Sequence, residues 1–250
     1  MKRLLLALLL LVSAAPAGAE TLVSTVSNPN VQITSSFDGA TLSLFGSIEA
    51  DPGGAPPAGP YNVIVVVTGP LQDRVTRIKT NNFGIWSNTD QVNFQHFPSF
   101  YAVVSSGKLE VIAPEELLTE YAIPPEEQAR LAAQSSGLKG ERFGIELVRL
   151  MAEDGHFILR DDGVRFLSDT AYAVNLTLPS DVANGAFIVR TLVLKDKLLV
   201  AERSESFSVR KSGFENFVFV ASRQQPLLYG IVCVILALST GWLAGVVFRR

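Results

Sequence analysis

The segment YNVIVVVT, residues 61–68, has the pattern of a β-strand with apolar side chains on both faces. β-Branched residues favour strands, and an unbroken apolar run, in place of alternation, is typical of a strand covered on both sides. Gly69-Pro70 ends the segment, and the preceding loop DPGGAPPAGP, residues 51–60, excludes helix or central strand there. We therefore expect Tyr61–Thr68 to be a central strand of the fold.

Segments on both sides of this strand alternate between apolar and polar residues, as half-buried strands do. Residues 41–49 place Leu42, Leu44 and Ile48 on one face, with Phe45 as the exception. Residues 172–178 alternate in the same way, and residues 186–194 and 198–209 form a predicted hairpin around Lys195-Asp196-Lys197. The fold class is mainly β, an immunoglobulin-like β-sandwich. One sandwich whose early and late strands pair is the preferred form, and two sandwiches joined by helices is the alternative.

The middle of the chain predicts helices. Pro114-Glu115-Glu116 and Pro124-Pro125-Glu126-Glu127 resemble helix starts, since proline suits the first helical position and carboxylates complement the helix dipole. Gly137 and Gly140 are expected to break the second helix, and a third is expected at about residues 141–153. The periplasmic domain, residues 20–213, would thus contain a helical insertion at about 114–155.

The first 19 residues predict a signal peptide. Lys2 and Arg3 precede the apolar run Leu4–Val12, and Ala17-Gly18-Ala19 is typical of a cleavage site. The alternative is an uncleaved anchor, but this run is shorter than the ~20 residues that a spanning helix needs.

A transmembrane helix is predicted at residues 227–248, which contain no ionisable group except Tyr229 and Cys233. Arg249 and Arg250 are expected to form a cytoplasmic tail, because positive charge marks the cytoplasmic side of a span. The expected protein crosses the bacterial inner membrane once, with its body in the periplasm. The juxtamembrane segment 214–226 is either a last strand or a helix lying at the interface.

Charge and cysteine content limit the function classes. The exported body carries 17 basic and 24 acidic residues, a net charge of −7, which argues against nucleic acid as a partner. The one cysteine, Cys233, lies in the predicted span, so the body is expected to be held by its apolar core without a disulfide.

The segment RIKTNNFGIWSN, residues 77–88, is the candidate ligand or partner site. Arg77 and Lys79 share a strand face and could hold an anion or an acidic surface. Asn82, after Asn81, is expected to mark a tight turn, Gly84 to permit close approach, and Trp86 to make contacts. The alternative is an edge strand protected by its cations, followed by a turn, with Trp86 in the core.

Three small residues in the span, Ala237, Gly241 and Gly245, share one helix face. Small residues let membrane helices approach closely, so this face is a candidate for packing against a partner's helix or a second copy. The alternative is that glycine is simply frequent in spans.

No catalytic or metal-binding pattern stands out. His96 and His156 are far apart in sequence and lack carboxylates at metal-ligand spacing, and the adjacent acidic pairs suit helix starts better than catalysis. We expect no enzyme activity, no cofactor and no metal.

Several motifs together resemble a family of alphaproteobacterial membrane proteins described as putative transmembrane proteins. They are Thr68-Gly69-Pro70, R-x-K-x-x-x-F-G-I-W-S-N at 77–88, P-S-F-Y-A-V at 98–103, and N-F-V-x-x-A, P-L-L-Y-G and G-W-L-A between 216 and 244. The resemblance implies a signal peptide, an exported body and one C-terminal span, and it implies no catalytic residues. It also suggests a neighbouring permease of the sulfite-exporter type as a partner.

The leading hypothesis is a membrane-anchored periplasmic binding or accessory protein, with a permease or a second copy as partner. The alternative is a small-anion-binding module using Arg77 and Lys79, and an enzyme is the third hypothesis.

Overall fold

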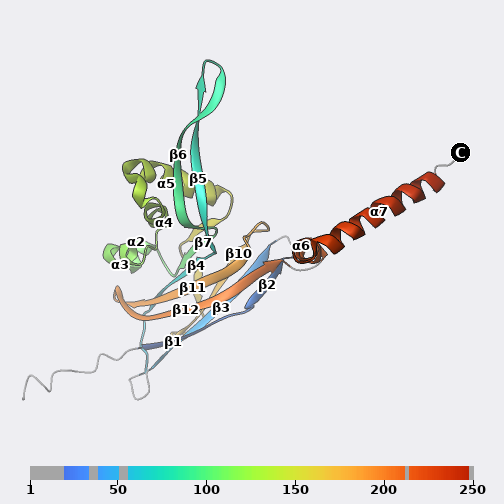
Figure 1. Ribbon diagram of the computed structural model, residues 1–250. Coiled ribbons are helices and arrows are strands. Elements are labelled where there is room, and N and C mark those ends of the chain that lie inside the picture. The colour runs from blue at the N-terminus through green and yellow to red at the C-terminus, as the bar shows by residue number, and fades with distance from the viewer. Residues whose placement is uncertain (1–19, 34–38, 51–55, 212–213, 248–250) are drawn as a thin grey trace, which may run out of the picture.

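A computed structural model describes residues 20–33, 39–50, 56–211 and 214–247. The expected signal peptide and cytoplasmic tail lie outside these residues. Two β-sheets and a group of helices form the body, with a long hairpin projecting from it and two further helices leading away at the C-terminal end (Figure 1).

The strands belong to two sheets and one separate hairpin. The four-stranded sheet has the order β1 (Glu20–Val26), β3 (Ala40–Ala50), β10 (Ala171–Leu178) and β9 (Val164–Phe166). The six-stranded sheet has the order β2 (Asn30–Ile33), β12 (Leu198–Lys211), β11 (Gly185–Lys195), β4 (Asn62–Thr68), β7 (Tyr101–Ser105) and β8 (Phe157–Arg160). The hairpin consists of β5 (Leu71–Asn82) and β6 (Ile85–Pro98).

Strand β4 is covered on both faces, as its composition predicted. Val63, Val65 and Val67 belong to the apolar core between the two sheets. Ile64 and Val66 belong to a second core between the six-stranded sheet and the helices. One strand therefore contributes to both cores, and the body has three layers: sheet, sheet and helices.

Strands from the two halves of the chain pair across the helical segment. Strand β3 pairs with β10 and β4 pairs with β11, both antiparallel. The preferred one-sandwich form predicted such pairing of early and late strands, and the mainly-β fold class is confirmed. Two strand pairs are parallel, β2 with β12 and β7 with β8. The immunoglobulin-like character of the sandwich stays a prediction.

In the sequence, the helices of the body lie between β7 and β8. They are α2 (Leu109–Ile112), α3 (Glu115–Glu120), α4 (Pro125–Ala132), the 3-10 turn η1 (Gln134–Ser136) and α5 (Gly137–Glu153). Pro114 caps α3 and Pro125 begins α4, so both predicted starts are confirmed. The predicted break at Gly140 is wrong, because α5 already begins at Gly137 and Gly140 packs closely against Ala133.

A buried tyrosine ties the helices to the sheet. The hydroxyl of Tyr101 on β7 lies 3.0 Å from the carbonyl oxygen of Ala122 and 2.9 Å from that of Ile123, in the link between α3 and α4. The amide of Gln128 on α4 donates to the same Ala122 oxygen at 2.6 Å. Burial raises the pKa of Tyr101, so its hydroxyl stays protonated and α4 keeps a fixed place over the sheet.

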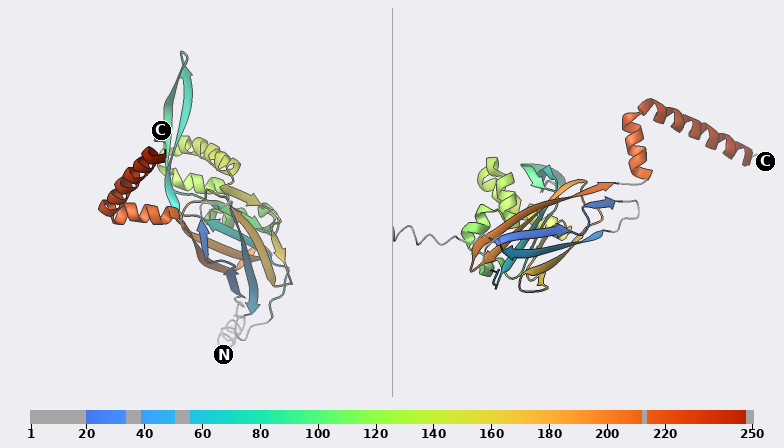
Figure 2. Two further views of the ribbon diagram at one scale, coloured as in Figure 1. Left: turned by 90° about the vertical axis from the view of Figure 1, so that its right-hand side faces the viewer. Right: turned by 90° about the horizontal axis from the view of Figure 1, so that it is seen from below.

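Beyond the body, α6 (Phe214–Gln224) and α7 (Pro226–Val247) follow β12 (Figure 2). The juxtamembrane segment is thus a helix and not a strand. Helix α7 is long and apolar enough to cross a membrane, and it is the one such candidate among the described residues.

The shared strand predicts that both cores unfold together. Ile64→Ala on the helix side and Leu176→Ala between the sheets each remove a fully buried side chain, so each should cost about 2–5 kcal/mol of unfolding free energy. Ile145→Ala on α5 is the control, because that side chain is 54% exposed and its loss should cost no more than about 0.5 kcal/mol. Urea unfolding of the full-length protein in mild detergent, followed by far-ultraviolet circular dichroism, should show one transition. Two transitions, each shifted by only one of the variants, would contradict the shared strand.

Candidate binding arm

The hairpin β5–β6, residues 71–98, is the connection between two neighbouring strands of the central sheet. Strands β4 and β7 pair directly, and a short turn would suffice to join them. Two backbone hydrogen bonds join the end of β4 to the start of β7. Gly69 N donates to the Phe100 oxygen at 2.8 Å, and Ser99 N donates to the Pro70 oxygen at 3.0 Å. Between these hydrogen-bonded ends the chain extends outward as a long hairpin, and we call residues 71–98 the arm (Figure 1).

The root of the arm is held by apolar packing beneath the helices. Val92, Phe94 and Phe97 on β6 are buried in the helix-side core. The Phe97 ring stacks on that of Phe157, with ring centroids 5.3 Å apart, and meets Phe94 edge-on at 5.9 Å. Strand β6 thereby rests on α4 and α5, which fixes the direction in which the arm leaves the body.

Strand β6 carries two irregularities in its pairing with β5. The register shifts between Gln72 and Arg74 and again between Ile78 and Lys79, and β6 supplies one more residue than β5 each time. At the first shift His96 has φ of 53°, and its backbone N–H donates to the Asp73 carboxylate at 3.0 Å. Bulges of this kind increase the twist of a ribbon and disrupt the hydrogen-bonding edge that another strand would need.

An ion pair joins the arm to the helices of the body. Asp90 on β6 pairs with Lys139 on α5. Beyond this point, residues 77–89 contain two cations and no carboxylate. We call residues 77–89 the distal arm.

The arm ends in a two-residue turn made by Phe83 and Gly84. Both have left-handed backbones, with φ of 53° and 84°, as a two-residue hairpin turn of type I′ requires. The side chain of Asn81 accepts a hydrogen bond from Gly84 N at 2.8 Å. The expectation that Asn81-Asn82 form the turn is therefore wrong, since they are the last residues of β5 and Asn82 pairs with Ile85. Asn81 supports the turn from outside it.

Three large apolar residues at the end of the arm face solvent. Phe83 is 106% exposed, Ile85 71% and Trp86 62%, and we call them the apolar tip. The alternative that placed Trp86 in the core is wrong. Gly84 has open space around it and serves the turn. Phe83 and Ile85 were not among the predicted site residues, although the Phe-Gly dipeptide midway between two strand-like segments was a signal for them.

Arg77 and Lys79 lie on the exposed part of β5, below the apolar tip. Arg77 donates through Nε to the side-chain oxygen of Gln91 at 3.4 Å. Neither cation belongs to an ion pair within the described parts of the chain. Both charges are therefore free to meet a ligand or a partner.

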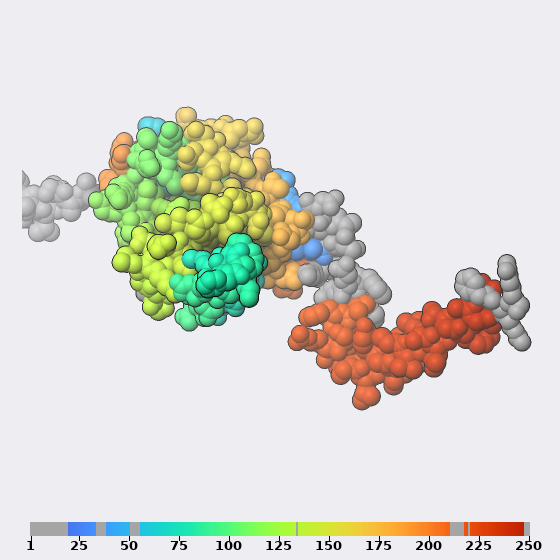
Figure 3. All heavy atoms as spheres, turned by 90° about the horizontal axis from the view of Figure 1, so that it is seen from above, coloured from blue at the N-terminus to red at the C-terminus, as the bar shows by residue number. Residues whose placement is uncertain are grey.

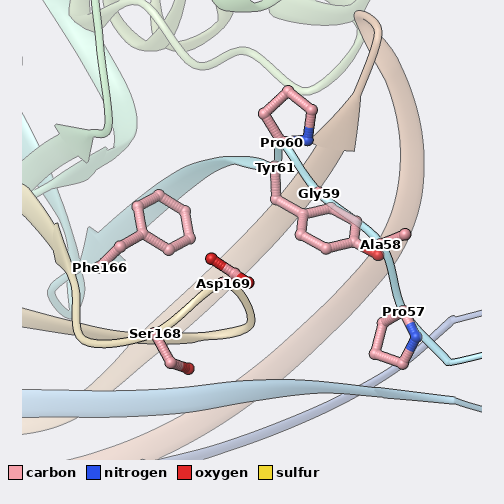
Figure 4. A pocket seen from close by; sticks show the side chains of 8 residues that line it. All are labelled: Pro57, Ala58, Gly59, Pro60, Tyr61, Phe166, Ser168 and Asp169. Atoms are coloured by element: carbon pink, nitrogen blue, oxygen red, sulfur yellow. The ribbon is translucent and has the colours of Figure 1, made fainter.

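The body also has a shallow hollow of about 630 Å³ beside the loop before β4. In Figure 4 the Asp169 carboxylate lies between the rings of Phe166 and Tyr61. The Tyr61 hydroxyl donates to Glu20 at 2.8 Å, and the Lys195 ammonium lies 5.5 Å from the centre of the Tyr61 ring. Desolvation and the Glu20 carboxylate raise the pKa of Tyr61 to about 12. Tyr61 thus already has its partners within the body.

The two histidines stay apart from each other. His156 pairs with the exposed Asp181 through Nε2 at 3.4 Å, whereas His96 lies at the bulge of the arm. Across the described ranges, no group of three or more His, Cys, Asp or Glu residues is placed to hold a metal ion.

The three small residues proposed to pack against another helix lie on α7. Ala237, Gly241 and Gly245 are one helical turn apart, and a Cβ added at either glycine would meet nothing within 4 Å. The face is therefore open to another helix.

Comparison with known families agrees with the candidate span. The family described as putative transmembrane protein (Alph_Pro_TM) matches residues 21–250, nearly the whole chain, so the protein belongs to that family. The match covers the arm, both cores and the candidate span. No curated protein matches the chain.

The turn geometry predicts that Phe83 destabilises the arm. Phe83→Asn gives the Asn-Gly pair that type I′ turns prefer, and little packing is lost because Phe83 is fully exposed. We expect a gain of about 1 kcal/mol and roughly five-fold slower hydrogen exchange of the amides in the distal arm. Gly84→Ala is the opposing control, since φ of 84° disfavours alanine, and exchange should become faster. Faster exchange in Phe83→Asn would contradict this account of the turn.

Proposed function

We propose that this protein is a single-span accessory protein of the bacterial inner membrane, with its body in the periplasm, that acts by binding a neighbouring membrane protein. The family and the apolar helix α7 support the membrane anchor. The predicted signal peptide and the arginines after the span support the orientation.

The observation that carries this proposal is the apolar tip of the arm. A two-stranded ribbon is at best marginally stable alone, so its projection beyond the body has to be supported by the packing at its root. Its edges are protected by Arg77, Lys79 and the bulges of β6. Its end, by contrast, exposes Phe83, Ile85 and Trp86 together. Grouped exposed apolar residues of this kind mark protein-binding sites, and aromatic residues are the usual anchors of such contacts.

The partner that we propose is a permease of the sulfite-exporter type, the class that the sequence resemblance suggests. The face of Ala237, Gly241 and Gly245 would pack beside a helix of that permease, and the arm would contact its exported surface. Two contacts on one chain strengthen each other, because the span holds the arm near its target. A homodimer through the span is the other arrangement that this face allows. Binding without catalysis is the role we propose, with no cofactor.

A matched pair of substitutions tests the role of the apolar tip. Ile85→Ser and Leu198→Ser each replace an aliphatic side chain at a hairpin, exposed by 71% and 70%. Tagged full-length protein would be purified from its native membrane in mild detergent, and the co-purifying protein measured by mass spectrometry. We expect Ile85→Ser to reduce its recovery at least roughly ten-fold, as loss of an interface anchor does, and Leu198→Ser to leave it unchanged. Equal recovery from both variants would sink the proposal.

The span makes its own contribution, which Gly241→Leu with Gly245→Leu would remove. Two added side chains would hold a neighbouring helix away, so the same partner should be lost from the detergent complex. If the double variant loses the partner while the Ile85→Ser variant still recovers it, the contact lies in the membrane and not at the arm.

The second candidate function is binding of a small anion by Arg77 and Lys79. Their freedom from ion pairs within the described residues favours it. Sulfate or sulfite should then raise the melting temperature of the full-length protein in proportion to occupancy, and Arg77→Glu with Lys79→Glu should abolish that shift. An identical anion-dependent shift in the variant would exclude these two residues as the site.

A further inference from the structure

We propose that the arm inserts its apolar tip as a preformed wedge into an apolar pocket with an acidic rim on the exported part of the partner protein. This inference rests on the proposed function and specifies the surface that the arm recognises.

The tip is preformed for insertion. The left-handed turn and the hydrogen bond from Gly84 N to Asn81 fix the position of Phe83 at the extreme end of the ribbon. Ile85 and Trp86 follow directly behind it. A left-handed backbone is unfavourable for a bulky residue compared with its ordinary conformation. A side chain kept in such a position while fully exposed points to a contact outside the chain.

The charge of the distal arm defines the rim. Arg77 and Lys79 lie a few residues behind the apolar tip, and residues 77–89 carry no carboxylate. Asp90, the nearest acidic residue along β6, is already paired with Lys139. When the tip enters a pocket, two unneutralised cations therefore come to its edge, and carboxylates there would complement them.

Seen from above, the end of the arm faces the viewer while α7 runs across the picture (Figure 3). In Figure 1 the arm rises from the body, and α7 leaves it obliquely, away from the base of the arm.

The test uses the full-length protein in its native membrane, with a benzophenone side chain in place of Trp86. After irradiation, mass spectrometry identifies the crosslinked peptide. We expect a segment of a different protein that has apolar residues next to Asp or Glu. The same probe at Leu198, which is also exposed, is the control and should give no such crosslink.

The acidic rim is tested by charge. Arg77→Glu with Lys79→Glu should reduce the crosslink yield roughly ten-fold, and so should raising the salt from about 0.1 M to about 1 M, which shortens the screening length from about 10 Å to about 3 Å. Lys108→Glu with Arg165→Glu changes the net charge equally at exposed sites elsewhere and should leave the yield unchanged.

Each other outcome overturns a different statement. A protein crosslink that responds neither to salt nor to the reversal at Arg77 and Lys79 overturns the acidic rim and leaves the accessory function standing. A crosslink to lipid overturns the pocket in favour of the bilayer, and a crosslink to the chain's own peptides makes the partner a second copy. A probe at position 86 that crosslinks to nothing more than the probe at position 198 contradicts the proposed function itself.

Discussion

Burial of β4 on both faces is the constraint from which the rest of the body follows. Its valines at 63, 65 and 67 require a second sheet, and its residues at 64 and 66 require a layer of helices. Both requirements must be met by segments far away in sequence, which explains why β3 pairs with β10 and β4 with β11. The body has no cysteine among residues 20–211, so these two apolar cores take the place of a disulfide.

The same constraint positions the arm. Because β4 and β7 are adjacent and lie under the helices, any long connection between them must pass the edge of the helical layer. Strand β6 uses this edge, burying Val92 and Phe94 against α4 and α5 before the ribbon becomes free. Tyr101 holds the start of α4 through the carbonyl groups of Ala122 and Ile123, so the support beneath the arm is itself tied to the central sheet. A rigid base is what makes an exposed tip useful for recognition.

Local patterns revealed the body better than the arm. Strand β4 and the helix starts at Pro114 and Pro125 were predictable, because composition and proline geometry act within a few residues. The turn was misplaced by two residues, since Asn81-Asn82 is the better turn sequence by propensity and Phe83 the worse one. The pairing of Asp90 with Lys139 was not predictable, because it joins elements 49 residues apart. The exposure of Trp86 depends on how far the ribbon extends beyond α5. That distance is set by tertiary packing and cannot be read from a local sequence pattern.

The misplaced turn is also the strongest indication of function. Were stability the only requirement, the turn would fall on the asparagines, and Phe83 would pair within the ribbon or be absent. The chain instead holds Phe83 left-handed and fully exposed, and it keeps Ile85 and Trp86 beside it. A large apolar residue that is held left-handed and fully exposed breaks the local rules, and such breaks are expected where a further constraint acts. Since the edges of the ribbon are protected and its end is not, we propose that this constraint is contact with something outside the chain.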